Sequence, residues 1–262
     1  MNYNKFTYTD YLQHVKSGDF KCAAGRRHSE SSDSGFYQTP DFKTAFNYAV
    51  KGWAQGIEKL EQIETRETVK KTRRRRASRS GSRYNIGRVI SGHPTPCYKT
   101  QTIKRETRRQ IDVYIKLSYT ADVKGETALN YAGEVLQHVN ELQQKNDIRL
   151  IGVFDTHFNK KKRDVCDVIL KEYSTPLEFN TIAFACHPSF FRRVRWRDLE
   201  CSQYAKGAKG SSLNDSAYIE RIKDQNAKEG KQRDAYILHT CQSYNYDKLY
   251  KRAECIVIKA EA

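Results

Sequence analysis

A run of basic side chains in the first third of the chain has the clearest chemical meaning. Its members are Lys70, Lys71, Arg73, Arg74, Arg75, Arg76, Arg79 and Arg83. Adjacent guanidinium groups repel one another unless an anion lies between them, and guanidinium binds phosphate oxygens well. We expect this run to bind the phosphates of a nucleic acid. A solvated linker and a nuclear-localisation signal are the alternatives that these residues leave open.

A second basic cluster alternates with aromatic residues. It consists of Phe190, Phe191, Arg192, Arg193, Arg195, Trp196 and Arg197. Bases in single strands stack on aromatic rings, while arginines hold the backbone phosphates. The cluster therefore predicts single-strand binding. The competing interpretation is a helix in which Phe190 and Val194, four positions apart, face a core while the arginines face water.

The sequence carries no motif that predicts catalysis, a metal or a cofactor. It lacks the glycine-rich nucleotide-binding patterns and the serine nucleophile elbow, and no two cysteines form a C-x-x-C pair. Asp155 and His157 follow an expected strand, but no second carboxylate accompanies them there. We therefore expect a protein that is not an enzyme.

Charge and hydropathy restrict the partners. The chain has 262 residues and a formal net charge of +16, which favours a polyanion as partner. Fifteen Lys and Arg against two Glu give the segment from Arg66 to Arg109 a net charge of +13. No apolar stretch approaches the roughly 18 residues of a membrane span, and the first residues show no signal peptide. These features predict a cytoplasmic protein without a membrane partner.

The chain divides into four expected parts. A polar N-terminal arm covers residues 1–40, and a helical segment covers 41–69, with apolar residues at helical spacing from Phe42 to Val50. The basic residues then form a loop or linker over 70–109, which we expect to be mobile because it has no apolar face. The remaining residues, 110–262, form an α/β domain.

A strand–helix–strand pattern defines the fold class of this last part. Ile111–Leu117 and Ile148–Phe154 are rich in β-branched and aromatic residues, and the helix between them begins at Gly125. Such a unit requires a parallel pair of strands. Further strands are expected at Val165–Leu170, Ala235–Thr240 and Cys255–Ile258. We expect an open, mostly parallel α/β sheet, doubly wound in style.

The end of the first of these strands resembles that of a von Willebrand A-type domain. This family has an Asp-x-Ser-x-Ser pattern there, and its loop binds a divalent metal. Ser118 and Thr120 match the two hydroxyl positions, whereas Lys116 stands in place of the metal-binding aspartate. An ammonium repels a divalent cation, so the resemblance implies a degenerate A-like fold without a working metal site.

A wider resemblance joins the chain to an uncharacterised family of phage-encoded proteins. It rests on Ala49–Gly56, on Tyr84–Pro94 and on the strand–helix–strand unit at similar distances. The resemblance implies a virus-encoded protein, located in the host cytoplasm. The charge and size are also similar to those of the podovirus single-stranded-DNA-binding cofactors that recruit a phage RNA polymerase.

Three functions are compatible with these features. The first is a non-catalytic nucleic-acid-binding protein that prefers single-stranded DNA and acts as an accessory factor in transcription or replication, with a phage RNA polymerase or replication protein as possible partner. The second is a protein–protein interaction module that docks an acidic partner such as a polymerase or virion component. The third is a metal-dependent nuclease.

Overall fold

The chain forms two units in the computed structural model, and each is described by itself. Unit 1 comprises residues 1–66 and 109–262, and unit 2 comprises residues 67–108. The structure describes residues 2–18, 28–64, 76–78, 83–95, 97–99, 109–119, 123–159, 162–201, 209–210, 220–224, 228, 235–238 and 255–258.

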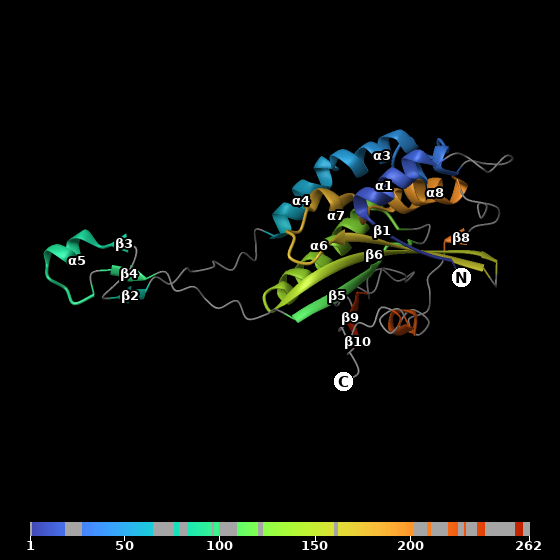
Figure 1. The fold of residues 1–262 in the computed structure, drawn as a ribbon. Coiled ribbons are helices and arrows are strands. Elements are labelled where there is room, and N and C mark those ends of the chain that lie inside the picture. Colours follow the sequence, from blue (N-terminus) through green and yellow to red (C-terminus); the bar gives the residue numbers. More distant parts are fainter. Residues whose placement is uncertain are drawn as a thin grey trace. The chain divides into compact units, whose positions relative to one another are not determined.

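A single sheet forms the centre of unit 1, with the strand order β1-β7-β6-β5-β9-β10 (Figure 1). Its strands are β1 (Asn2–Thr7), β5 (Arg109–Lys116), β6 (Asn146–Asn159), β7 (Lys162–Lys171), β9 (Ala235–Leu238) and β10 (Cys255–Ile258). From β1 to β9, three of the four pairings are parallel, and β7 with β6 is the antiparallel one. The antiparallel strands β10 and β8 (Lys209–Gly210) pair with β9 and β6. The expected open, mostly parallel α/β sheet is thus confirmed.

The strand–helix–strand unit has the predicted form. Strand β5 pairs in parallel with β6, so that Ile111 lies opposite Ile148 and Lys116 opposite Val153. The connection contains α6 (Gly125–Gln143), which buries an apolar stripe from Ala128 to Val139. Apolar residues at helical spacing form this stripe, because only one side of the helix can face the sheet.

The described helices that can be followed in Figure 1 as α1, α3, α4, α7 and α8 lie on one side of the sheet. In unit 1, the helices preceding α6 are α1 (Tyr8–Ser17), α2 (Ser34–Tyr37), α3 (Phe42–Lys51) and α4 (Ala54–Glu64), with the short 3₁₀ turn η1 (His28–Glu30). Those after β7 are α7 (Phe179–Ala185), the π-helical η2 (Phe190–Arg195) and α8 (Trp196–Cys201). The described helical residues 220–224 lie on the other side of the sheet, where Arg221 binds Asp167 of β7.

The N-terminal residues belong to the fold, so the expectation of a polar arm is wrong for residues 2–18. Strand β1 extends the sheet by pairing in parallel with β7, with Tyr3 opposite Val165. Helix α1 follows at once, capped by the Thr7 hydroxyl, and buries Tyr11 and Val15 completely or nearly so. An edge strand needs few apolar residues because one of its sides is open, which makes β1 hard to recognise.

The two faces of the sheet differ in chemistry. Side chains alternate along a strand, and Ile111, Val113 and Ile115 of β5 pack into the apolar core with Phe184 and Phe190 from the helices. The residues between them point to the other face, where Asp112 is buried and binds Arg149 of β6. This second face therefore carries buried charge.

Unit 2 contains a small antiparallel sheet with the order β2-β4-β3. Its elements are β2 (Arg76–Ser78), β3 (Arg83–Tyr84), α5 (Ile86–Ile90) and β4 (Cys97–Lys99). The segment expected to be a loop over 70–109 thus contains regular structure in its described residues. Strands of two or three residues leave no periodicity that a sequence pattern could reveal.

Within the described residues, no helix has both the length and the apolar composition needed to cross a membrane.

Candidate functional site

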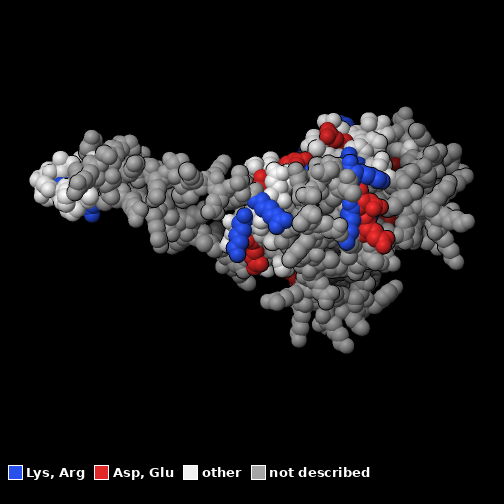
Figure 2. Space-filling view, turned by 60° about the horizontal axis from the view of Figure 1, so that its bottom comes forward, with Lys and Arg blue, Asp and Glu red and all other residues white. Residues whose placement is uncertain are grey.

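Most of the surplus positive charge lies in unit 2. Thirteen Lys and Arg stand against two Glu between residues 67 and 108, which gives +11 of the net +16 and leaves +5 for unit 1. On the face of unit 1 shown in Figure 2, described Lys and Arg side chains lie beside Asp and Glu side chains. A mixed surface of this kind has a weak field, whereas an excess of one sign attracts polyanions.

Two arginines of the predicted phosphate-binding run are placed by strands. Arg76 begins β2 and lies opposite Lys99 in the backbone register, and Arg83 begins β3 opposite Tyr98. The other members lie outside the described residues; they are Lys70, Lys71, Arg73, Arg74, Arg75 and Arg79. The small sheet thus brings basic residues from three separate stretches of the sequence to neighbouring positions.

The second predicted cluster lies in the interior, which is a correction. Phe190 and Phe191 are buried in the apolar core, where both rings stack on Phe154 of β6. Arg192, Arg193 and Arg195 are at most 1% exposed. Such side chains have no free surface for bases or phosphates, so they do not form a single-strand-binding surface.

The buried guanidinium groups of Arg192 and Arg193 bind the backbone of distant loops within unit 1. Arg192 donates to the carbonyls of Phe36 at 2.6 Å and Val123 at 2.9 Å. Arg193 donates to the Thr39 hydroxyl at 2.8 Å and to the carbonyls of Ser29, Thr39 and Pro40. Each guanidinium has five donors, so one side chain can satisfy several loop carbonyls at once.

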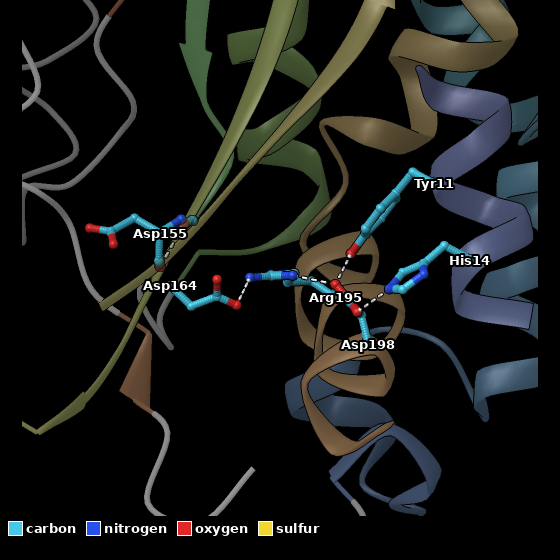
Figure 3. A network of polar contacts seen from close by, with 7 residues as sticks. Tyr11, His14, Asp155, Asp164, Arg195 and Asp198 are labelled. Carbon is cyan, nitrogen blue, oxygen red and sulfur yellow. Dashed lines mark hydrogen bonds and ion pairs between the residues drawn. The ribbon is translucent and has the colours of Figure 1, made fainter. Parts of the chain in front are cut away.

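Arg195 joins helix η2 to the sheet and to α1 (Figure 3). It donates to Asp164 of β7 at 2.7 Å and to Asp198 of α8. Asp198 also accepts from the Tyr11 hydroxyl at 3.3 Å and lies 3.1 Å from Nε2 of His14. Burial alone would raise the pKa of Asp198, but Arg195 and His14 bring it below its usual value.

The remaining two members of the cluster are only partly buried. Arg197 pairs with the carboxylate of Glu30 at 3.1 Å and lies over the ring of Phe42. Trp196 is the first residue of α8. Arg197 thus connects α8 to η1 and α3.

The charged face of the sheet contains two further buried pairs. Arg149 binds Asp112 with two hydrogen bonds, of 2.6 and 2.9 Å, and Tyr173 also donates to this carboxylate. Arg221 binds Asp167 of β7 at 3.0 Å. In Figure 3, Asp155 points to the opposite side of the sheet from Asp164. Asp155 lies within β6, not beyond its end, and no three His, Cys, Asp or Glu side chains among the described residues gather as metal ligands.

At the end of β5, Ser118, which matches a hydroxyl position of the A-type pattern, forms hydrogen bonds to β6. The Ser118 hydroxyl donates to the carbonyl of Asp155 at 3.0 Å, and the Asp155 amide donates back to it at 2.7 Å. Lys116 is buried on the charged face. The Ser118 contacts connect the end of β5 to β6, so this hydroxyl has a structural role in the sheet.

A cavity of about 390 Å³ lies beside the start of α6, within unit 1. Its wall includes Trp53, Lys59, Lys124, Gly125 and His187. The sequence analysis did not single out any of these five residues as site residues. They lie on three separate stretches of the sequence, so their proximity follows only from the way α4, α6 and α7 pack.

Comparison with known proteins gives a family but no activity. No curated protein matches the sequence. The sequence profile described as a domain of unknown function (DUF7192) matches residues 3–258, which spans both units and nearly all of the chain. The chain therefore belongs to the DUF7192 family.

Proposed function

We propose that the protein is a non-catalytic nucleic-acid-binding protein, with single-stranded DNA as the preferred ligand, and that unit 2 is its binding element. The observation that carries this proposal is the separation of charge. Unit 2 holds +11 of the net +16, while three arginines of the other basic cluster are occupied inside unit 1. A cytoplasmic accessory role in transcription or replication, beside a phage RNA polymerase or replication protein, follows as part of the same proposal.

Phosphate contacts would dominate the affinity. Each lysine or arginine that neutralises a phosphate releases a counterion, so binding weakens steeply with salt and shows little sequence preference. The register of β2, β4 and β3 supports this role because it sets Arg76, Arg83 and Lys99 on neighbouring strands.

The test is a titration of fluorescent single- and double-stranded DNA and RNA oligomers at several salt concentrations. Replacing Arg73, Arg74, Arg75 and Arg76 with Ser should reduce the slope of log K against log salt by about 3 for single strands, at roughly 0.7 per phosphate contact. The matched control replaces the exposed Lys16, Lys43, Lys51 and Lys145 of unit 1 with Ser, which changes the net charge equally. Equal effects of the two sets would refute a binding role for unit 2.

A protein partner is the second candidate, and helix α5 favours it. Ile86 and Ile90 are 73% and 81% exposed, and Val89 lies beside them on the same side of the helix. An apolar patch inside a strongly basic unit fits an acidic protein surface. Replacing Ile86 and Ile90 with Ser should then abolish a protein complex that survives nuclease treatment, while leaving DNA binding unchanged.

The metal-dependent nuclease stays a prediction. DNA cleavage that requires magnesium and stops on addition of a chelator would support it.

A further inference from the structure

The cavity beside the start of α6 has a neutral hydrogen-bond donor in its wall. The backbone amide of Ser189 donates to Nδ1 of His187 at 3.1 Å, so the proton of the neutral ring lies on Nε2. Trp53 packs edge-on against this ring with 4.5 Å between the ring centroids, and Phe184 stacks on it with 5.5 Å between the centroids. Burial, with a smaller contribution from Arg192, lowers the pKa of His187 to about 3, so the ring is neutral at pH 7.

The Nε2 atom of His187 points to the first residue of α6. A Cβ atom on Gly125 would lie 2.7 Å from Nε2 and 2.9 Å from the side-chain oxygen of Gln38, so any larger residue would displace one of these side chains. His187 is 5% exposed, and its Nε2 has no hydrogen-bond partner among the described residues. His187 lines the cavity, so a ligand there can accept the hydrogen bond of this donor.

The start of α6 adds further donors to the same cavity. Lys124, at the N-cap position, makes no side-chain cap, and the Gly125 amide donates to Gln38. The amide of Glu126, which also lines the cavity, has no carbonyl within the helix to bind. The 19-residue helix also presents the positive end of its dipole here, which favours an anion.

The charged groups of the wall favour an anion as well. Lys59 of α4 and Lys124 both line the cavity and are exposed, and they approach it from different elements. The carboxylate of Glu126 is the opposing charge on the rim, and it is exposed to solvent. Two ammonium groups against one carboxylate leave a positive balance.

We propose that this cavity binds the phosphate group of a small molecule, with the first turn of α6, His187, Lys59 and Lys124 as the phosphate-binding groups. The donors come from several directions, which suits a tetrahedral oxyanion better than a planar carboxylate. At about 390 Å³ the cavity is within the usual range for small-molecule sites, and it is larger than inorganic phosphate requires. The source of the phosphate is therefore either the free ion or a monoester such as a nucleoside monophosphate, and Trp53 borders the remaining space.

The test is calorimetric titration of the full-length protein with inorganic phosphate and with AMP, at constant ionic strength. We expect saturable binding at one site per chain. Replacing Lys59 and Lys124 with Ala should weaken this binding at least tenfold. Replacing the exposed Lys43 and Lys145 with Ala, which removes the same charge elsewhere, should change it less than twofold. Tighter binding of AMP identifies a monoester as the ligand, and binding of phosphate alone identifies the free ion; either result supports the site.

A second variant tests the geometry rather than the charge. Gly125→Ala places a methyl group beside Nε2 of His187 and should abolish phosphate binding. Its circular dichroism spectrum and unfolding midpoint show whether the variant keeps the fold. If it does not, the variant with Ala at Lys59 and Lys124 decides the outcome. Absence of saturable binding, or equal weakening by the Lys43 and Lys145 pair, would overturn the proposal.

This site is independent of the proposed nucleic-acid binding. The variant with serine at Arg73 to Arg76 should lose DNA affinity and keep phosphate binding, because these arginines belong to unit 2 and the cavity belongs to unit 1. Loss of phosphate binding in that variant would show that the arginines, not the cavity, bind the anion.

Discussion

The guanidinium of Arg195 lies between two carboxylates in the interior of unit 1. Burial opposes its charge, but Asp198 and Asp164 more than compensate and hold the pKa of Arg195 above its ordinary value. Removing one member of a buried ionic group leaves the others without compensation, at a cost of about 3–5 kcal/mol. Arg195→Met should therefore lower the free energy of unfolding in urea by about that amount. Arg197→Met, at the more exposed pair with Glu30, should cost at most about 1 kcal/mol. Similar effects of the two changes would contradict the central role of Arg195.

His14 gives the same network a dependence on pH. Its hydrogen bond to Asp198 raises the pKa of His14, although burial opposes this. A group whose pKa is raised in the folded state contributes stability fully below its unfolded pKa, and this contribution is lost as the pH rises through the folded pKa. Stability should thus fall between about pH 6 and pH 8 by more in the wild type than in His14→Gln. Unfolding curves at both pH values measure the difference, and parallel curves would exclude His14 as the titrating group.

At the scale of elements, helix α1 tests whether the N-terminus is part of the core. Tyr11 is fully buried against Phe154 and Phe190, whereas Gln13 on the same helix is exposed. Tyr11→Ala should cost about 3–5 kcal/mol, as large aromatic residues do in cores. Gln13→Ala should change stability by about 0.5 kcal/mol or less. If the first residues were a loose arm, both changes would be neutral.

At the scale of the whole molecule, the two units predict separable properties. Replacing residues 67–108 with a short glycine–serine linker removes the β2-β4-β3 sheet and +11 of charge. Unit 1 has its own core and should unfold cooperatively with a similar midpoint. The affinity for single-stranded DNA at about 100 mM salt should fall roughly a hundredfold or more, because most phosphate contacts are lost. A chain that keeps its affinity after this replacement would place the binding surface in unit 1.

The strand–helix–strand unit could be read from the amino acids alone because its signal is local. Ile111 to Leu117 and the stripe from Ala128 to Val139 repeat their apolar residues at the period of the element they form. Burying such a stripe requires a neighbouring sheet, so periodicity determined both the elements and their parallel pairing. The concentration of charge in residues 66–109 is likewise a property of the sequence and does not depend on folding.

Burial of the arginines was decided by the tertiary structure. The sequence shows Arg192, Arg193 and Arg195 beside aromatic residues, but their partners lie at Phe36, Thr39 and Asp164, far away along the chain. A charged side chain can be buried only where distant segments supply acceptors, and a local pattern holds no record of them. For the same reason the cavity at α6 could not be predicted, since Lys59, Gly125 and His187 meet only when three helices pack. Local periodicity thus determined the elements of this protein, and long-range packing decided which of its charges are available to bind.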